Sequence, residues 1–347
     1  MEEKIITEKT KLLKEDGTLN VVGYSKTPLV EYNSEFIKKR SRMKEWDYYY
    51  IADSRFGLCL TISNLSYATA ISASVIEFNV RNQVNKTSVA MFPKNKPVLA
   101  ESSSVGVSMA KTKDADFKFE TRDGKRHLVG IYKNYYPENG SNRDLEFDIE
   151  LYNEPEESMV KVTPFKKKHQ FYYNQKINGM TASGNFTYKG RNYVFDARDT
   201  LATLDWGRGV LPYSSLWYWA SMQAKTRDGN IIGFNLGRAF GDNSDATENM
   251  IFVNGKAHKI GDIRINIRRD NRKHDYMGTW TFYSDDGRIE LMFEPILDRY
   301  APFNALVIAF LPHQVFGKYS GKLILDDGNV IEIDNVPGFA ERVVNRW

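Results

Sequence analysis

The sequence predicts an all-β protein built from two antiparallel β-barrel halves in tandem, with few short helices. Three observations support this prediction. Aromatic residues make up 13% of the 347 residues, and aromatic side chains favour strands. Turn signals recur at short intervals between runs of β-forming residues, which is typical of sandwiches and barrels. An aromatic hairpin pattern also occurs once in each half of the chain.

The turn signals are Asn-Gly and Asp-Gly pairs, which supply the positive φ angles that tight hairpins need. They occur at Asp16-Gly17, Asp123-Gly124, Asn139-Gly140, Asn178-Gly179, Asp228-Gly229, Asn254-Gly255, Asp286-Gly287 and Asp327-Gly328, with Lys189-Gly190 as a similar pair. Runs such as FTYKGRNYVF, TWTFYSDDGRIELMF and KLILDDGNVIEI place strands on both sides of such pairs.

The elements follow in order along the chain. Residues 1–30 are expected to form an extended polar arm, and 33–45 one short helix capped by Asn33 or Ser34. Residues 43–110 read as successive strands, and 115–152 as a hairpin followed by another strand. The acidic segment 153–164 contains two prolines and is the best candidate linker.

The linker divides the chain into an N-terminal half, residues 1–160, and a C-terminal half, residues 161–347, that carries most of the polar motifs. Trp46 and Trp217 begin similar aromatic strands, and the spacing between them, 217 − 46 = 171, also separates Asn64 from Asn235. Tyr48 falls on Trp219 at the same spacing. This gapless repeat at half the chain length predicts two structurally similar halves.

Composition narrows the class of protein. The formal net charge is only +4, which does not argue for nucleic acid as the main partner, because a protein that binds nucleic acid would need a clustered basic footprint. The single cysteine, Cys59, excludes an intramolecular disulfide and is expected to be a small buried hydrophobe. The N-terminus has no apolar signal-peptide core, and no apolar run is long enough to span a membrane, so we expect a cytoplasmic protein.

The hairpin around Asp228-Gly229 carries the two alternating tryptophans. A two-residue turn there would put Trp217 and Trp219 on the face of Phe234 and Leu236, and would leave Asn235 among small residues on the other face. The tryptophans would then either pack in a core or line an apolar pocket. Which face points inward stays open.

Polar residues gather around this hairpin. Asp205 and Arg208 lie in DWGRG, and Glu248 and Asn249 follow about forty residues later. Arg208 beside two carboxylates would form a paired network. Alternatively these side chains orient a ligand, or Glu248 and Asp205 act in catalysis, with Glu248 as a general acid of raised pKa. His258 follows a turn and is either structural or part of the same region.

The sequence contains no motif for a metal site or for a phosphate-bearing cofactor. No histidine has the spacing of a metal site, there is no cysteine pair for zinc, and no phosphate-loop or dinucleotide pattern occurs, so we expect neither a metal nor a cofactor. Two basic runs remain, at 166–169 and 264–273. They are either solvated edges that discourage aggregation or a contact surface for an anionic membrane or ligand head group.

These motifs together resemble a known family. The opening LLKEDGTLNVVGYSKTPLVEYN, then KEWDYYYI, DWGRG, IIGFNLGRAFG, TENMIFVNGKAHKI and the C-terminal Arg-Trp are similar to the family of domains of unknown function numbered 2804. More distantly, the chain is similar to tandem lipocalin-like proteins that include carotenoid hydratases. That wider resemblance implies two lipocalin-like barrel halves and an apolar ligand, and it assigns no catalytic residue.

The leading hypothesis is that the chain binds a hydrophobic or amphipathic small molecule, such as a lipid or isoprenoid, in a β-barrel pocket. The ligand-binding residues would be Arg208, Trp217, Trp219, Asn235, Asn249 and His258. Alternatives are a hydratase, isomerase or cyclase acting without a cofactor on an apolar substrate, a carbohydrate-active protein, which paired carboxylates would suit, or a scaffold protein. The oligomeric state is not predicted.

Overall fold

The protein is all-β, as predicted. A computed structural model describes residues 3–138, 141–305 and 308–346, and in this part the helices are two three-residue 3-10 turns, η1 (Ser34–Phe36) and η2 (Arg40–Arg42). These turns replace the short helix expected over 33–45, because the chain already becomes extended at Met43. Within the described residues, no helix is long and apolar enough to cross a membrane. The predicted turn at Asn139-Gly140 lies outside this part.

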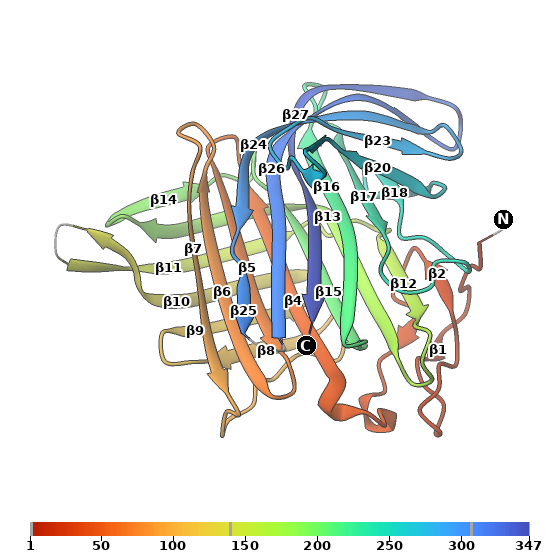
Figure 1. Ribbon diagram of the computed structural model, residues 1–347. Helices are drawn as coiled ribbons and strands as arrows, with labels where there is room; N and C mark the ends of the chain where they lie inside the picture. The colour runs from red at the N-terminus through yellow and green to blue at the C-terminus, as the bar shows by residue number, and fades with distance from the viewer. Residues whose placement is uncertain (1–2, 139–140, 306–307, 347) are drawn as a thin grey trace.

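The strands form two large, curled antiparallel sheets, each a half-barrel (Figure 1). The first sheet contains β2 (Gly23–Ser25), β4 (Met43–Ala52), β5 (Phe56–Asn64), β6 (Ala68–Glu77), β7 (Asn82–Met91), β8 (Gly106–Lys111), β9 (Ala115–Arg122), β10 (Lys125–Glu138), β11 (Ser141–Tyr152), β12 (Met159–Pro164), β13 (Phe171–Tyr188), β14 (Arg191–Phe195) and β15 (Leu201–Val210).

The second sheet contains β16 (Ser214–Lys225), β17 (Ile231–Arg238), β18 (Met250–Val253), β19 (Lys256–Lys259), β20 (Ile263–Ile267), β23 (Trp280–Ser284), β24 (Ile289–Tyr300), β25 (Phe303–Ala305), β26 (Ile308–Ile324) and β27 (Val330–Arg346). Two short pairs complete the structure: β1 (Thr10–Lys11) with β3 (Val30–Glu31), and β21 (Arg269–Asp270) with β22 (Lys273–His274).

The chain changes sheet between Val210 and Ser214. The predicted division at residue 160 does not coincide with this change, because the expected linker contributes β12 to the first sheet and β13 and β15 follow in the same sheet. Part of the N-terminal arm also joins this sheet, since β2 pairs with β12.

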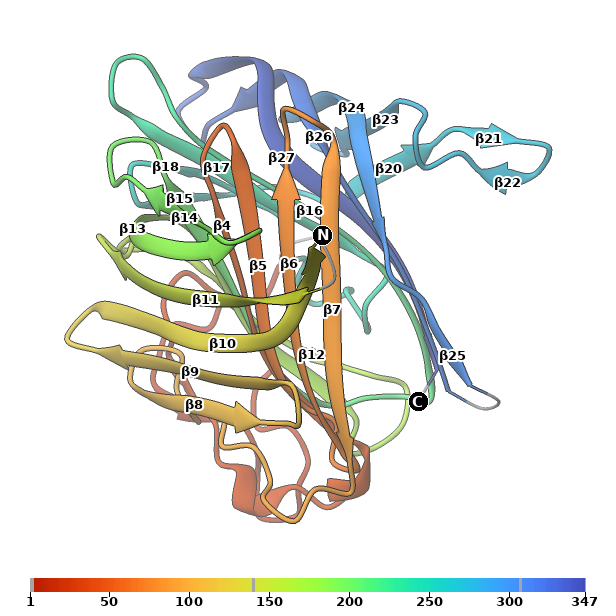
Figure 2. The same cartoon turned by 90° about the vertical axis from the view of Figure 1, so that its left-hand side faces the viewer.

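The central strands of the two sheets pack against each other. The orders β5-β4-β15-β13 and β17-β16-β27-β26 form the middle of the two sheets, and Figures 1 and 2 show these strands adjacent while the outer strands curl away. Because side chains alternate along a strand, Tyr49 of β4 and Met222 of β16 fill the separate cores of the two half-barrels, whereas Tyr48 and Trp219 lie in the cluster between the sheets.

The hairpin of β16 and β17 differs from the prediction by one residue. Lys225 pairs with Ile231, and Thr226 N donates to Asn230 O, so the loop has three residues and Gly229 takes the left-handed conformation (φ +83°). A one-residue change of register moves every partner to the other face. Trp219 therefore lies opposite Gly237 and beside Asn235, and not with Phe234 and Leu236 as predicted.

The repeat holds on the first strand of each hairpin and fails on the second. Tyr48 and Trp219 occupy matching places, but their partners across the hairpin are Thr61 and Gly237, whose spacing (237 − 61 = 176) is not 171. The two hairpin loops have different lengths. As a result Asn64, which bonds Glu45, and Asn235, which bonds Trp219, point to opposite faces of their sheets.

Candidate active site

A lysine and two carboxylates meet where the outer faces of the sheets touch. Lys176 on β13 pairs directly with Asp205 on β15, and its Nζ lies 3.2 Å from Asp205 Oδ1. Glu248, just before β18, brings its Oε2 to 4.0 Å from the same nitrogen. All three side chains are at least 88% buried. Buried charges are stable only when paired, so the three groups depend on one another.

Neutral donors and an aromatic ring complete the surroundings of this group. Trp46 Nε1 donates to Asp205 Oδ2 (3.1 Å), and Asn174 Nδ2 donates to Glu248 Oε2 (3.3 Å). Lys176 Nζ lies 3.7 Å from the centroid of the Trp219 ring, which is close enough for a strong cation–π interaction. Tyr172 stacks on Trp46 with 5.4 Å between ring centroids. The result is a charged cluster with aromatic walls.

Two glycines make room for these side chains. A Cβ on Gly207 would lie 2.3 Å from the Trp46 ring, and a Cβ on Gly237 would lie 1.8 Å from Glu248 Oε1. Any other residue at these positions would displace the Trp46 indole from Asp205 or the Glu248 carboxylate from Lys176. The glycines of DWGRG and GFNLG therefore serve close approach of a side chain to the backbone.

A third carboxyl, Glu341 of β27, lies in the same interface. Its Oε1 accepts from Trp217 Nε1 (2.7 Å) and its Oε2 from Gln314 Nε2 (3.0 Å). Burial raises the pKa of Glu341 to about 7, although Trp217 and the charge of Lys176 act in the opposite direction. Glu341 is therefore a carboxyl that can hold or release a proton near neutral pH.

The two carboxyl environments are copies of each other. In one sheet Asp205 pairs with Lys176 on one side and Tyr48 on the other, and in the second sheet Glu341 pairs with Gln314 and Trp219 in the same way. A second set of contacts crosses between the sheets, where Trp219 covers Lys176 and Tyr48 OH donates to Gln314 Oε1 (3.5 Å).

Each copy also has a tryptophan two residues before its aromatic partner, and the indole of that tryptophan donates to the carboxyl. The copies differ in charge at the polar residue that pairs with the carboxyl, which is Lys176 in one sheet and Gln314 in the other. The candidate site thus has one pole at Asp205, which lies beside a cation, and one pole at Glu341, whose hydrogen-bond partners Trp217 and Gln314 are neutral.

Burial affects the acidity of the neighbouring groups as well. It raises the pKa of Asp205, while Lys176 and Trp46 oppose the rise and the charge of Glu248 adds to it. Burial also raises the pKa of the Tyr172 hydroxyl well above its usual range, with Asp205 and Glu248 as further causes. Asn174 is fully buried, yet its Oδ1 has no hydrogen-bond partner, so the cluster retains an unused acceptor.

The structure brings some predicted site residues together. Asp205 and Glu248 lie on either side of Lys176, as described above. Asn235 accepts from Trp219 Nε1 (2.7 Å) and donates to the Glu248 backbone oxygen (2.8 Å), so it holds both residues in place. Trp217 binds Glu341. Their roles in binding or catalysis stay predictions.

Other predicted residues lie elsewhere. Arg208 is three residues after Asp205 on one strand and therefore points to the opposite face, where it pairs with Asp47 (2.8 Å) inside the first half-barrel. The expected network of Arg208 with Asp205 and Glu248 is thus wrong. Asn249 links the Gly237 amide to the Gly261 carbonyl, and His258 contacts Asp326 at 3.1 Å in a distant turn.

Sequence reasoning missed Lys176, Glu341, Gln314 and Asn174. Lys176 and Asn174 lie in a long buried strand without a motif, and Glu341 is one acid near the C-terminus. The repeat contained a usable signal, because it aligns Trp46 with Trp217, the two indoles that mark the carboxyls. Among the described residues, no group of three or more His, Cys, Asp or Glu side chains is arranged to hold a metal ion.

The fold and the cluster define a class: all-β proteins of two half-barrels with a polar site between them. Within this class, the chain belongs to the family described as domain of unknown function DUF2804, whose model matches residues 3–347. This confirms the resemblance inferred from the motifs. No curated protein matches the sequence.

Solved structures share the fold at low identity. A protein assigned as AttH from Nitrosomonas europaea is 13% identical with a TM-score of 0.52, covering 90% of this chain and 96% of its own. CghA with Sch210972 is 9% identical with a TM-score of 0.52, and 88% of each chain is covered. Kievitone hydratase from Nectria haematococca is 12% identical with a TM-score of 0.46, covering 87% and 88%. The two likenesses with a TM-score of 0.52 show the fold alone.

Proposed function

We propose that the protein is an enzyme that performs acid–base chemistry on an apolar or amphipathic small molecule at the interface of the two sheets. The observation that carries this proposal is Glu341, a buried carboxyl with a pKa of about 7, in one cluster with the Lys176–Asp205 pair. Groups that titrate near the working pH are the best general acids and bases.

The division of roles follows from the charges. Lys176 lies against Asp205 and favours its carboxylate form, which suits a proton acceptor. Within the part of the chain that the structure describes, the hydrogen-bond donors to Glu341 are the neutral groups of Trp217 and Gln314, which suits a proton donor. Adding water to an unsaturated substrate, removing water from it, or moving its double bond each need one donor and one acceptor. Trp46, Tyr172 and Trp217 supply flat walls for such a substrate.

The test begins with the substrate. Native mass spectrometry and organic extraction of freshly purified protein identify what is bound, and the extracted compound is then incubated with the protein in D₂O. We expect deuterium to enter the compound, or water to be added to it. Glu341→Gln and Asp205→Asn should each slow this at least about a hundredfold, the usual contribution of a general acid or base.

A matched control comes from the same strand. Glu332 of β27 is exposed, so Glu332→Gln changes the same chemical group outside the cluster and should leave turnover intact. If Glu341→Gln turns the compound over as fast as wild type, the proposed role of Glu341 is wrong.

A second candidate is binding without turnover, as in a carrier. Buried apolar side chains form a core in each half-barrel. A cavity of about 540 Å³ does lie at one end of the first half, bounded by Val30, Tyr32, Tyr173 and the 101–104 loop. The basic β21–β22 hairpin would then dock on an anionic membrane. Retention of a compound that no variant or condition converts would favour this function.

A further inference from the structure

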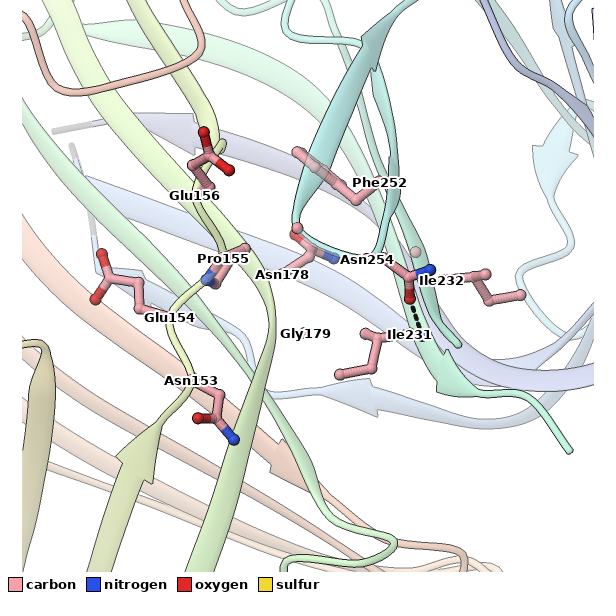
Figure 3. Close-up of a pocket in the computed structure, with 12 residues that line it drawn as sticks. Asn153, Glu154, Pro155, Glu156, Asn178, Gly179, Ile231, Ile232, Phe252 and Asn254 are labelled. Carbon is pink, nitrogen blue, oxygen red and sulfur yellow. Dashed lines mark hydrogen bonds between the residues drawn. The ribbon is translucent and has the colours of Figure 1, made fainter. Parts of the chain in front are cut away.

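A second cavity lies between the sheets at a bulge in β13. Its volume is about 420 Å³, and Figure 3 shows residues 153–156 and 178–179 on one side, with Ile231, Ile232 and Phe252 on the other. Ligand pockets for small molecules begin at about this size. Asn178-Gly179, predicted as a hairpin turn, is instead part of the bulge, because the register with β15 shifts between Ile177 and Met180.

The bulge turns Asn178 into the second sheet. Its Nδ2 donates to Ser221 Oγ (2.9 Å), Phe234 O (3.2 Å) and Met222 O (3.3 Å), which fixes the orientation of the amide. The other end of the amide, Oδ1, has no hydrogen-bond partner, although Asn178 is 97% buried and lines the cavity. A buried acceptor without a partner costs about 1–3 kcal/mol.

A second unpartnered group lies close by. Gln223 accepts from the Gly179 backbone amide through its Oε1 (2.7 Å), and this bond fixes the side-chain amide. Its Nε2 is buried and has no partner. Gln223 also lies directly opposite Gly233, which lines the cavity. Asn178 thus borders the cavity directly, whereas Gln223 lies behind Gly179 and Gly233, which line it. Each side chain keeps one buried polar atom without a partner, an acceptor on Asn178 and a donor on Gln223.

The charges at the rim are already neutralised. Glu154 pairs with Arg126 (2.7 Å) and Glu156 with Lys256 (2.6 Å). The other side chains on the lining are uncharged: Pro155, Phe252 and the two isoleucines are apolar, and Asn153 and Asn254 are neutral amides. A cation therefore gains no unpaired carboxylate here, and the favoured ligand is neutral.

We propose that this cavity binds a neutral small molecule in which a hydrogen-bond donor and acceptor adjoin on an apolar body, as in a carboxamide or lactam. The donor of the ligand bonds Asn178 Oδ1, its acceptor meets Gln223 Nε2, and its apolar body packs on Phe252 and Ile231. The site shares no side chain with the carboxyl cluster, so it stands or falls independently of the proposed enzymatic activity.

The test uses benzamide and acetophenone as probes. They have the same shape, but only benzamide has the N–H donor that Asn178 requires. Ligand-observed NMR titration should show saturable benzamide binding about tenfold tighter than acetophenone, the usual effect of one buried hydrogen bond. Asn178→Leu should remove this preference.

Because Asn178 also holds three structural bonds, a second variant keeps the test independent of folding. Ile231→Trp fills the cavity from its apolar wall, leaves Asn178 and Gln223 themselves unchanged, and should abolish benzamide binding. Val330→Trp, at the exposed start of another strand, is the matched control and should bind as wild type. The proposal would be overturned if the two probes bind with equal affinity, or if Ile231→Trp binds benzamide as wild type does. Absence of saturable binding to the wild type would also overturn it, because the Asn178 amide would then bind only water.

Discussion

At the scale of single residues, the site depends on carboxyls that burial makes weaker acids. Glu341 accepts hydrogen bonds from the neutral donors Trp217 and Gln314, whereas Asp205 has the ammonium group of Lys176 beside it. Arg208 shows the opposite case, a fully buried cation whose charge Asp47 neutralises within the first half-barrel. Both charged pairs lie on neighbouring strands, yet they belong to opposite faces of one sheet.

The pKa of Glu341 predicts how stability depends on pH. The folded protein binds this proton up to about pH 7, and the unfolded chain releases it near pH 4.5, so stability should fall as pH rises between these values. The loss is about 3.5 kcal/mol at most, from about 1.4 kcal/mol for each unit of pKa. Urea unfolding at pH 5 and pH 8 should show a smaller loss for Glu341→Gln than for wild type. Parallel curves for the two proteins would contradict the raised pKa, and Glu332→Gln should follow wild type.

At the scale of elements, glycines within strands decide where the site residues can lie. Gly237 in β17 is covered by Glu248, which approaches from the next segment of the chain. Gly207 in β15 is covered by Trp46 from the neighbouring β4. These are close approaches in ordinary extended backbone, and they differ from the turn glycines such as Gly229, where the positive φ is the reason for glycine.

Gly237→Ala should therefore destabilise the protein by overpacking, by about 1–3 kcal/mol. The new methyl group would push Glu248 away from Lys176 and Asn174. The double variant Gly237→Ala, Glu248→Ala removes the clashing side chain and should be more stable than the two separate effects predict. A double-mutant cycle from thermal unfolding measures this difference. Simple additivity would show that the two residues do not clash.

At the scale of the whole molecule, the chain places two copies of one arrangement against each other. In each copy a carboxyl lies between a polar residue on one neighbouring strand, Lys176 or Gln314, and an aromatic residue on the other. The aromatic residue of each copy also contacts the polar residue of the other copy. The difference between Lys176 and Gln314 is what makes the two poles unlike. This asymmetry is suited to a reaction that needs a donor and an acceptor at once.

Substituting Gln314 or Lys176 should change the pKa of Glu341. Gln314→Lys places a positive charge beside Glu341 and should lower its pKa below about 7, whereas Lys176→Gln removes a nearby charge and should raise it. Trp217 donates to Glu341, so its fluorescence should follow this titration. Lys189→Gln, which removes a lysine paired with Glu77 elsewhere, is the control. If Lys176→Gln leaves the titration unchanged, the two poles are not coupled.

Much of the fold was predictable because it depends on local patterns. Asp123-Gly124, Lys189-Gly190 and Asn254-Gly255 all form tight hairpins with positive φ at both residues. Asn178-Gly179 has the same chemistry but lies within a long strand, where it makes a bulge. The pair alone indicates a positive φ angle, and the strands on either side decide whether the chain reverses.

The sequence by itself determined the all-β class and the two related halves, and it singled out Asp205 and Glu248 as acids whose role stays a prediction. Composition, turn chemistry and the spacing of aromatic residues act over a few residues, so they can be read from the chain. Only the tertiary structure decided which face of its sheet each site residue occupies and which side chains it contacts. The register of one hairpin moved Asn235 to Trp219, and long-range strand pairing placed Lys176 beside Asp205 and Gln314 beside Glu341. The packing of the two sheets then placed Trp219 over Lys176. Such contacts depend on how two sheets pack, and no local pattern encodes that packing.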